Sequence, residues 1–153
     1  IAHLAGPSIL QIARLRMQGY VDALQKHGLP LDESLIVYHD LTEENARLCA
    51  RHLLDLPQPP EAIFAVNDPS ALEVLLLAKQ RGIKVPQDLG IVGFSNDPVS
   101  ALIEPALTTV DQPVWEIGEQ SALLLLEQLE QPKVEKRVLQ TRLIVRESSR
   151  RRS

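Results

Sequence analysis

Apolar runs alternate with helix-period patterns along the whole chain. Runs of strand length occupy residues 1–5, 35–38, 62–66, 89–94, 107–110 and 137–145. Longer segments with apolar residues three and four positions apart predict helices at residues 9–26, 43–56, 69–81 and 113–131. Several strand runs are apolar throughout, which is typical of parallel strands that helices cover on both faces. The pattern predicts an α/β fold in which a doubly wound, mostly parallel sheet is flanked by helices.

Turn and capping residues agree with the predicted ends of the helices. Thr42 precedes two glutamates, as a helix N-cap does. Asp68 and Asp97 each precede a proline, so each is predicted to cap a helix that begins with that proline. Gly28 and Gly82 follow predicted helices, where a left-handed residue closes the last turn.

Two predicted helices have more apolar residues than a helix needs when only one of its faces packs against a sheet. In the helix at 69–81, Leu72 and Leu76 widen the apolar face, which indicates either a subunit interface or a well-covered internal helix. In the helix at 113–131, Gly118 and Ala122 lie one turn apart and allow another backbone to approach closely. This last helix needs a partner that a small sheet does not supply.

Composition limits the function classes. The 153 residues, with 44% hydrophobic and 24% charged residues, fit one globular domain. A net charge of -4 argues against electrostatic binding of nucleic acid by this chain. The single cysteine, Cys49, lies in an apolar stripe, and no apolar run is long enough for a bilayer, so we expect a cytoplasmic protein with no membrane partner. Because the first residue, Ile1, already heads a strand run, we expect a fragment of a longer protein.

The predicted carboxyl ends of the strands are polar, and ligands of open parallel sheets bind beyond those ends. Hydroxyls, amides and carboxylates follow the runs at residues 6–8, 39–40, 67–68, 95–97 and 111–112. Such groups match the hydroxyls of a polyhydroxylated ligand. No phosphate-binding loop and no metal-ligand spacing occurs, so we predict neither a cofactor nor a metal. Residues 93–97 begin like the nucleophile elbow of a hydrolase, but Asp97 stands where that turn requires glycine.

Three segments at these strand ends resemble signatures of the LacI/GalR family of bacterial transcription regulators. They read AIFAVND at residues 62–68, VPQDLGIVGFSN at 85–96 and LTTVDQP at 107–113. Upstream, LAGP at residues 4–7 and RMQGY at 16–20 also match. The motifs occur in the family's order and cover nearly the whole chain.

The resemblance implies a periplasmic-binding-protein-like fold of two lobes, with a small-molecule effector, usually a carbohydrate, in the cleft between them. Residues 1–110 and 134–148 would form the second lobe, and the helix at 113–131 would pack on the first lobe. Family members bind operator DNA as homodimers through an amino-terminal helix-turn-helix headpiece. That headpiece and most of the first lobe are absent from this chain, so DNA would not bind through this fragment.

By motif, the resemblance implies effector contacts from six residues: Asn67, Arg16, Ser95, Asn96, Asp40 and Phe94. Ser95 stands where the family often has aspartate, and Leu41 where it often has a ligand-facing aromatic residue. The family's dimerisation helix corresponds to the segment that contains Leu72, Leu75 and Leu76.

The main hypothesis is therefore the effector-binding and dimerisation core of a sugar-responsive transcription regulator that is not an enzyme. Two alternatives stay open. One is a transport-type sugar-binding protein of the same fold, and the other, less favoured, is an α/β hydrolase that uses Ser95.

Overall fold

The computed structural model describes residues 1–130 and 132–150. Its main sheet is entirely parallel and has the strand order β2-β1-β3-β4. The strands are β1 (Ala2–Ala5), β2 (Ile36–Tyr38), β3 (Ala62–Ala65) and β4 (Gly90–Val92). The helices that connect them are α1 (Gln11–Lys26), α2 (Glu43–Leu54) and α3 (Asp68–Gln80). The predicted α/β fold with a mostly parallel sheet is confirmed.

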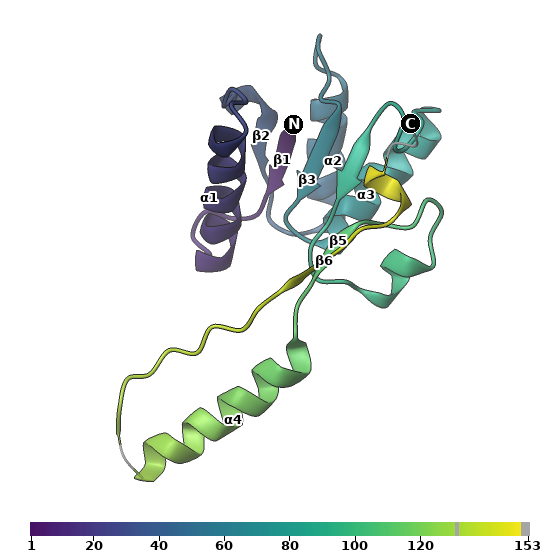
Figure 1. Cartoon of the computed structure of the whole chain (residues 1–153). Helices are drawn as coiled ribbons and strands as arrows, with labels where there is room; N and C mark the ends of the chain where they lie inside the picture. The colour runs from purple at the N-terminus through teal and green to yellow at the C-terminus, as the bar shows by residue number, and fades with distance from the viewer. Residues whose placement is uncertain (131, 151–153) are drawn as a thin grey trace.

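The side chains of β1 and β3 divide between the two faces of the sheet, because successive residues of a strand point in opposite directions. Leu4 and Ile63 belong to the buried core that α2 and α3 complete. His3 and Phe64, their neighbours in sequence, stack on each other, and His3 also stacks on Tyr20 of α1. Helices α2 and α3 therefore cover one face, and α1 covers the other (Figure 1).

His3 is a neutral histidine in this packing. It is fully buried, and burial lowers the pKa of its imidazole from 6.5 to about 4. Its Nδ1 donates a hydrogen bond to the carbonyl oxygen of Phe64 at 2.9 Å, since that oxygen can only accept. The buried Nε2 has no hydrogen-bond partner among the described residues. Protonating this ring would place an unpaired charge between aromatic rings.

We expect the free energy of unfolding to fall as the pH is lowered from 6.5 to 4. In that window His3 takes up a proton in the unfolded chain but not in the folded protein, so acid favours unfolding by about 3 kcal/mol across the window. Urea unfolding at several pH values measures this loss. His3→Gln should make the curve shallower, and the pH dependence that remains includes His39, whose pKa burial also lowers. His52→Gln, on the exposed surface of α2, is the matched control. Equal pH dependence in wild type and His3→Gln would contradict the assignment.

The capping predictions are partly confirmed. The Thr42 hydroxyl accepts a hydrogen bond from the backbone nitrogen of Asn45 and caps α2, and Gly28 and Gly82 have left-handed φ values of 66° and 69°. The cap of α3, however, is Asn67 and not Asp68, which lies inside the first turn.

Two further boundaries differ from prediction. Asp97 precedes only a short 3-10 helix, η2 (Pro98–Ala101), and its side chain makes no capping bond. Two more 3-10 helices are η1 (Glu33–Leu35) and η3 (Glu147–Ser149). Helix α1 begins at Gln11, two residues later than expected, because a turn from Pro7 to Leu10 precedes it.

The last two strands form a separate antiparallel pair, β5 (Thr109–Asp111) with β6 (Arg142–Ile144). β5 also adjoins the main sheet through parallel bridges from Val92 to Thr108 and from Ser95 to Asp111. The predicted strand at 137–145 is therefore mostly wrong, since only residues 142–144 pair. Residues 132–141 have no strand neighbour to supply hydrogen bonds and run as an irregular segment beside a helix (Figure 1).

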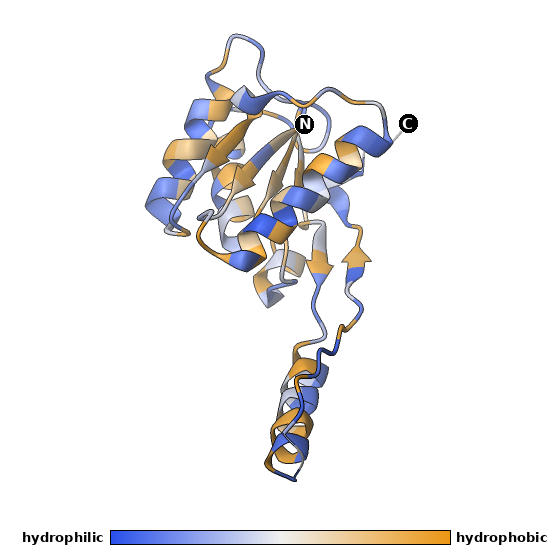
Figure 2. Cartoon of the chain, turned by 90° about the vertical axis from the view of Figure 1, so that its left-hand side faces the viewer, coloured by the Kyte–Doolittle hydropathy of each residue, from blue (hydrophilic) through white to orange (hydrophobic). Residues whose placement is uncertain are grey.

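That helix, α4 (Val114–Glu130), has no buried residue. Together with residues 132–141 it forms a projection, which we call the arm, below the body of the molecule (Figure 1). Apolar residues recur along the arm (Figure 2), and Trp115 is 86% exposed and Leu129 75% exposed. The body of this chain therefore leaves uncovered the apolar surface that the sequence indicated.

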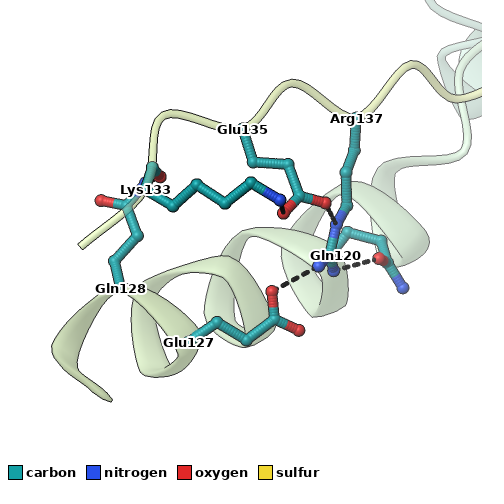
Figure 3. A network of polar contacts seen from close by, with 6 residues as sticks. All are labelled: Gln120, Glu127, Gln128, Lys133, Glu135 and Arg137. Carbon is teal, nitrogen blue, oxygen red and sulfur yellow. Dashed lines mark hydrogen bonds and ion pairs between the residues drawn. The ribbon is translucent and has the colours of Figure 1, made fainter. Parts of the chain in front are cut away.

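Polar contacts hold the two halves of the arm together (Figure 3). Arg137 donates hydrogen bonds to Glu127 and to Gln120 of α4 and forms an ion pair with Glu135. Gln128 of α4 donates to the carbonyl oxygen of Lys133 at 2.9 Å. Ile117 and Leu124 face the returning segment, whereas Trp115, Leu125, Leu126 and Leu129 stay exposed and are free for another surface.

Candidate functional site

The polar residues that follow the strands meet at one edge of the sheet, which we call the rim. The chain approaches itself closely there, since a Cβ on Gly6 would lie 3.2 Å from Val66 and 3.3 Å from Leu41. The turns after β1, β2 and β3 are therefore in contact. This is the edge at which open parallel sheets bind ligands.

Arg16 reaches this edge from α1. One guanidinium nitrogen, Nη1, donates to the carbonyl oxygen of Val66 at 2.5 Å, and the guanidinium carbon lies 3.8 Å from the centre of the Phe94 ring. Burial lowers the pKa of Arg16, and the charge of Asp68 acts in the opposite direction. The buried Nε has no hydrogen-bond partner among the described residues. The sequence placed Arg16 and Phe94 at the site separately, and the structure brings them into contact.

A cavity of about 660 Å³ opens beside this pair. Its polar lining includes Arg16 and Gln112, and Phe94 forms part of its apolar wall. The other lining residues are mostly apolar and come largely from α1, among them Ile12, Leu15, Gly19, Tyr20, Ala23 and Leu24. A mostly apolar cavity with a few polar groups is the usual form of a small-molecule site.

Asn67 has a structural task as well as a position at the rim. Its side-chain oxygen accepts hydrogen bonds from the backbone nitrogen of Ser70 at 2.9 Å and from the Ser70 hydroxyl at 2.5 Å. This cap occupies the oxygen, so the amide nitrogen is the part of the side chain that remains for a ligand. The backbone of Asn67 directly follows Val66, whose carbonyl oxygen holds Arg16.

Ser95 and Asn96 follow β4 with positive φ values of 129° and 55°. The Ser95 hydroxyl lies 3.4 Å from the Gln112 amide nitrogen. An amide cannot take up the proton of a nucleophile, so this contact gives no support to a hydrolase. Both ends of the Asn96 amide are engaged by protein groups, Asp111 and Arg146. The structure thus gives Asn96 a linking role where the sequence suggested an effector contact.

Asp40 lies in the exposed turn after β2. Its carboxylate accepts hydrogen bonds from the hydroxyl and the backbone nitrogen of Thr42, and these bonds lower the pKa of Asp40. The next residue, Leu41, has a φ of 70° and packs close to Gly6. The turn is therefore at the rim, although the Asp40 carboxylate is used within the turn itself.

Asp68 is the residue that the sequence interpretation missed. Its side chain is fully buried, and it accepts hydrogen bonds from the Asp97 backbone nitrogen at 2.8 Å, the Ser100 hydroxyl at 2.7 Å and the Thr109 hydroxyl at 2.6 Å. These bonds join the start of α3 to the loop after β4 and to β5. The AVND motif gives no sign of this network, because the three donors come from distant residues that only the fold brings to Asp68.

The three leucines expected at a dimer interface differ in exposure. Leu75 is 4% exposed and belongs to the core between α3 and the sheet, so it offers little surface to a partner. Leu76 is 47% exposed, and Leu72 is partly buried. Periodicity alone could not separate the core face of α3 from its outer face, because both are apolar.

Comparison with known proteins gives consistent matches over nearly the whole chain. A family model described as a periplasmic binding protein-like domain matches residues 1–149. The HTH-type transcriptional repressor CytR of Escherichia coli (strain K12) is 42% identical over 152 residues, which are 98% of this chain and 45% of the repressor.

Two solved structures agree with these matches. The complex of the transcriptional regulator CelR with cellobiose superposes with a TM-score of 0.90 at 36% identity, over 97% of this chain and 46% of CelR. A LacI-family regulatory protein from Chloroflexus aggregans gives a TM-score of 0.89 at 35% identity, over 97% of this chain and 54% of that protein.

The chain belongs to the periplasmic binding protein-like domain family. Its relatives place it among the effector-binding domains of LacI-family transcription regulators, as the motifs suggested. These relatives are regulators and not enzymes. The LacI-family chain spans about half the length of the proteins that it matches.

Neither a metal cluster nor a membrane-spanning helix is found in residues 1–130 and 132–150. No group of three or more His, Cys, Asp or Glu residues among them could hold a metal ion. Within the same residues, no helix is long and apolar enough to cross a membrane.

Proposed function

We propose that this chain is the sugar-sensing half of a LacI-type transcription regulator. The observation that carries the proposal is the position of Arg16, which is held between the Val66 carbonyl oxygen and the Phe94 ring at the mouth of a mostly apolar cavity. An arginine that is partly withdrawn from water, and whose guanidinium is held through Nη1, can donate from its remaining terminal nitrogen to an oxygen-rich ligand.

Three groups would bind the sugar. Arg16 donates from its guanidinium, Asn67 from the amide nitrogen that its cap does not use, and Ser95 offers one hydroxyl. Phe94 and the apolar residues of α1 would contact the less polar face of the ligand. The CelR structure is described as a cellobiose complex, which agrees with a carbohydrate as the ligand class of this family.

The arm would connect the sugar to the rest of the regulator. We propose that the exposed apolar residues of α4 pack on the first lobe, and that the effector lies in the cleft between that lobe and the rim. Binding would favour one closure of the two lobes, and this population shift would change operator affinity through the headpiece. This arrangement also explains why α4 has no buried residue in the chain alone.

A homodimer completes the proposal. The outer face of α3, with Leu76 and the partly buried Leu72, would contribute to the contact between copies. Operator DNA would be bound by the headpiece of the parent protein and not by this chain, whose net charge is -4. As part of the same proposal, the regulator would act in the cytoplasm.

Titration calorimetry of the parent regulator with a panel of mono- and disaccharides, cellobiose included, tests the sensing function. Arg16→Ala should weaken the binding of whichever sugar the wild type binds by about 30-fold or more, since buried arginine contacts at binding sites contribute about 2 kcal/mol or more. Arg51→Ala, on the exposed surface of α2, is the matched control and should bind like wild type. Operator binding that responds to no sugar, or equal affinities in the two variants, would refute the proposal.

A further inference from the structure

The loop after β4 is fastened to the strands that lead into and out of the arm. The backbone nitrogen of Ser95 donates to the Val110 carbonyl oxygen at 2.9 Å, and that of Asn96 donates to the Thr109 hydroxyl at 3.2 Å. Ser95 also forms a parallel bridge with Asp111, the last residue of β5. The rim therefore continues directly into β5.

The Asn96 side chain adds hydrogen bonds to two further residues, Asp111 and Arg146. Its amide nitrogen donates to Asp111 Oδ1 at 2.9 Å, and its oxygen accepts from Arg146 Nη2 at 2.8 Å. Arg146 is held in turn, since its Nη1 donates to the Leu107 carbonyl oxygen at 2.7 Å and its backbone nitrogen to the Thr108 hydroxyl at 2.8 Å. Asn96 thus bridges the end of β5 to the residues just after β6. We call this set of contacts the Asn96 bridge.

The two partners of Asn96 lie at opposite ends of the β5–β6 pair: Asp111 opposite Arg142 on the side of the arm, and Arg146 beside Leu107 on the side of the body. Asp111 precedes α4 by a short connection, and Arg146 follows β6, which brings the chain back from the arm (Figure 1). Any rotation of the arm relative to the rim must pass through this β5–β6 pair. Asn96 also keeps a φ of 55°, an uncommon backbone conformation that asparagine tolerates better than most residues.

We propose that Asn96 is a positioning residue that fastens the rim to both strands of the hinge, so that the rim and the base of the arm open and close as one body. The inference deepens the proposed function, on which it rests, because it supplies the connection from the sugar-binding loop to the lobe movement. Ser95 is adjacent to the bridge, so a ligand that shifts Ser95 also shifts Asp111 and Arg146.

Amide hydrogen exchange of the intact protein, measured without any ligand, tests this bridge. Asn96→Asp keeps the backbone preference and the acceptor for Arg146, but it places a second carboxylate against Asp111. The amides of Ser95, Asn96 and Arg146 should then exchange about tenfold faster, because pairs in direct contact couple on this scale. Adding Asp111→Asn restores a donor–acceptor pair and should restore protection. Asn45→Asp, the same change in α2, should leave all three amides as in wild type.

The outcomes separate the two proposals. Faster exchange at Ser95 and Arg146 together, reversed in the double variant, supports the bridge. Asp111→Asn alone introduces no like-charge pair and should accelerate exchange at the same amides by a smaller factor. This variant tests the bridge even if Asn96→Asp does not fold. Unchanged exchange, or acceleration confined to residues 95 and 96, would overturn the inference. A wild type that binds no sugar in calorimetry would overturn the proposed function and leave this result intact.

Discussion

Gly93→Ala is expected to destabilise the protein by about 3 kcal/mol, the upper range for overpacking a buried site. A Cβ at this position would overlap the Asp68 carboxylate and would lie 3.1 Å from a methyl carbon of Leu107. The Asp68 side chain cannot move aside, because it is fully buried and three donors hold it. Urea unfolding at pH 7, followed by circular dichroism, measures the loss.

Gly19→Ala is the matched control for this prediction. Gly19 lies in the interior of α1, and a Cβ there would meet nothing within 4 Å. The same change should therefore stabilise the protein by about 0.5–1 kcal/mol, since alanine loses less conformational entropy in a helix. Opposite signs at the two glycines are the expected result, and equal shifts would show that the Gly93 contact does not matter.

Asp68→Ala is expected to lower the free energy of unfolding by about 3 kcal/mol, as much as Gly93→Ala. It removes the acceptor of three buried or partly buried donors, from Asp97, Ser100 and Thr109, and an unsatisfied buried donor is costly. Thermal and urea unfolding give the value. Asp22→Ala, at an exposed carboxylate on α1, is the control and should change stability by less than about 0.5 kcal/mol.

The losses of unfolding free energy caused by Gly93→Ala and Asp68→Ala should not be additive. In the Asp68→Ala protein the carboxylate that Gly93→Ala would overlap is gone, so the glycine substitution should cost less there than in wild type. The double variant measures this coupling directly. Additive losses would mean that Gly93 is constrained by some other neighbour, of which Leu107 is the nearest.

The strand and helix pattern was readable from the sequence because each element buries a face of its own. The runs at 62–66 and 89–94 contain β3 and β4, and the stripe around Cys49 became the buried face of α2. The segment at 137–145 was misread because apolar residues at strand spacing need a neighbouring strand to pair with. Most of that segment lies beside α4, which offers side chains and no free backbone groups.

The candidate site was predictable as a place but not as an arrangement. Polar residues after parallel strands must meet at one edge, so Asn67, Ser95 and Asp40 were expected near one another. The contact of Arg16 with Phe94 joins residues 78 positions apart, which no local pattern encodes. The network of Asp68 and the bridge of Asn96 likewise depend on donors from distant segments.

The sequence by itself determined the layered α/β architecture, the family and the polar edge of the sheet. Those features follow from local periodicity, capping residues and short motifs. Only the tertiary structure decided that Leu75 is core while Leu76 is surface, that Asn67 and not Asp68 caps α3, and that α4 stands away from the body. The reason is physical: burial and hydrogen-bond partners are properties of surfaces that meet, and the chain specifies them only after its elements have packed.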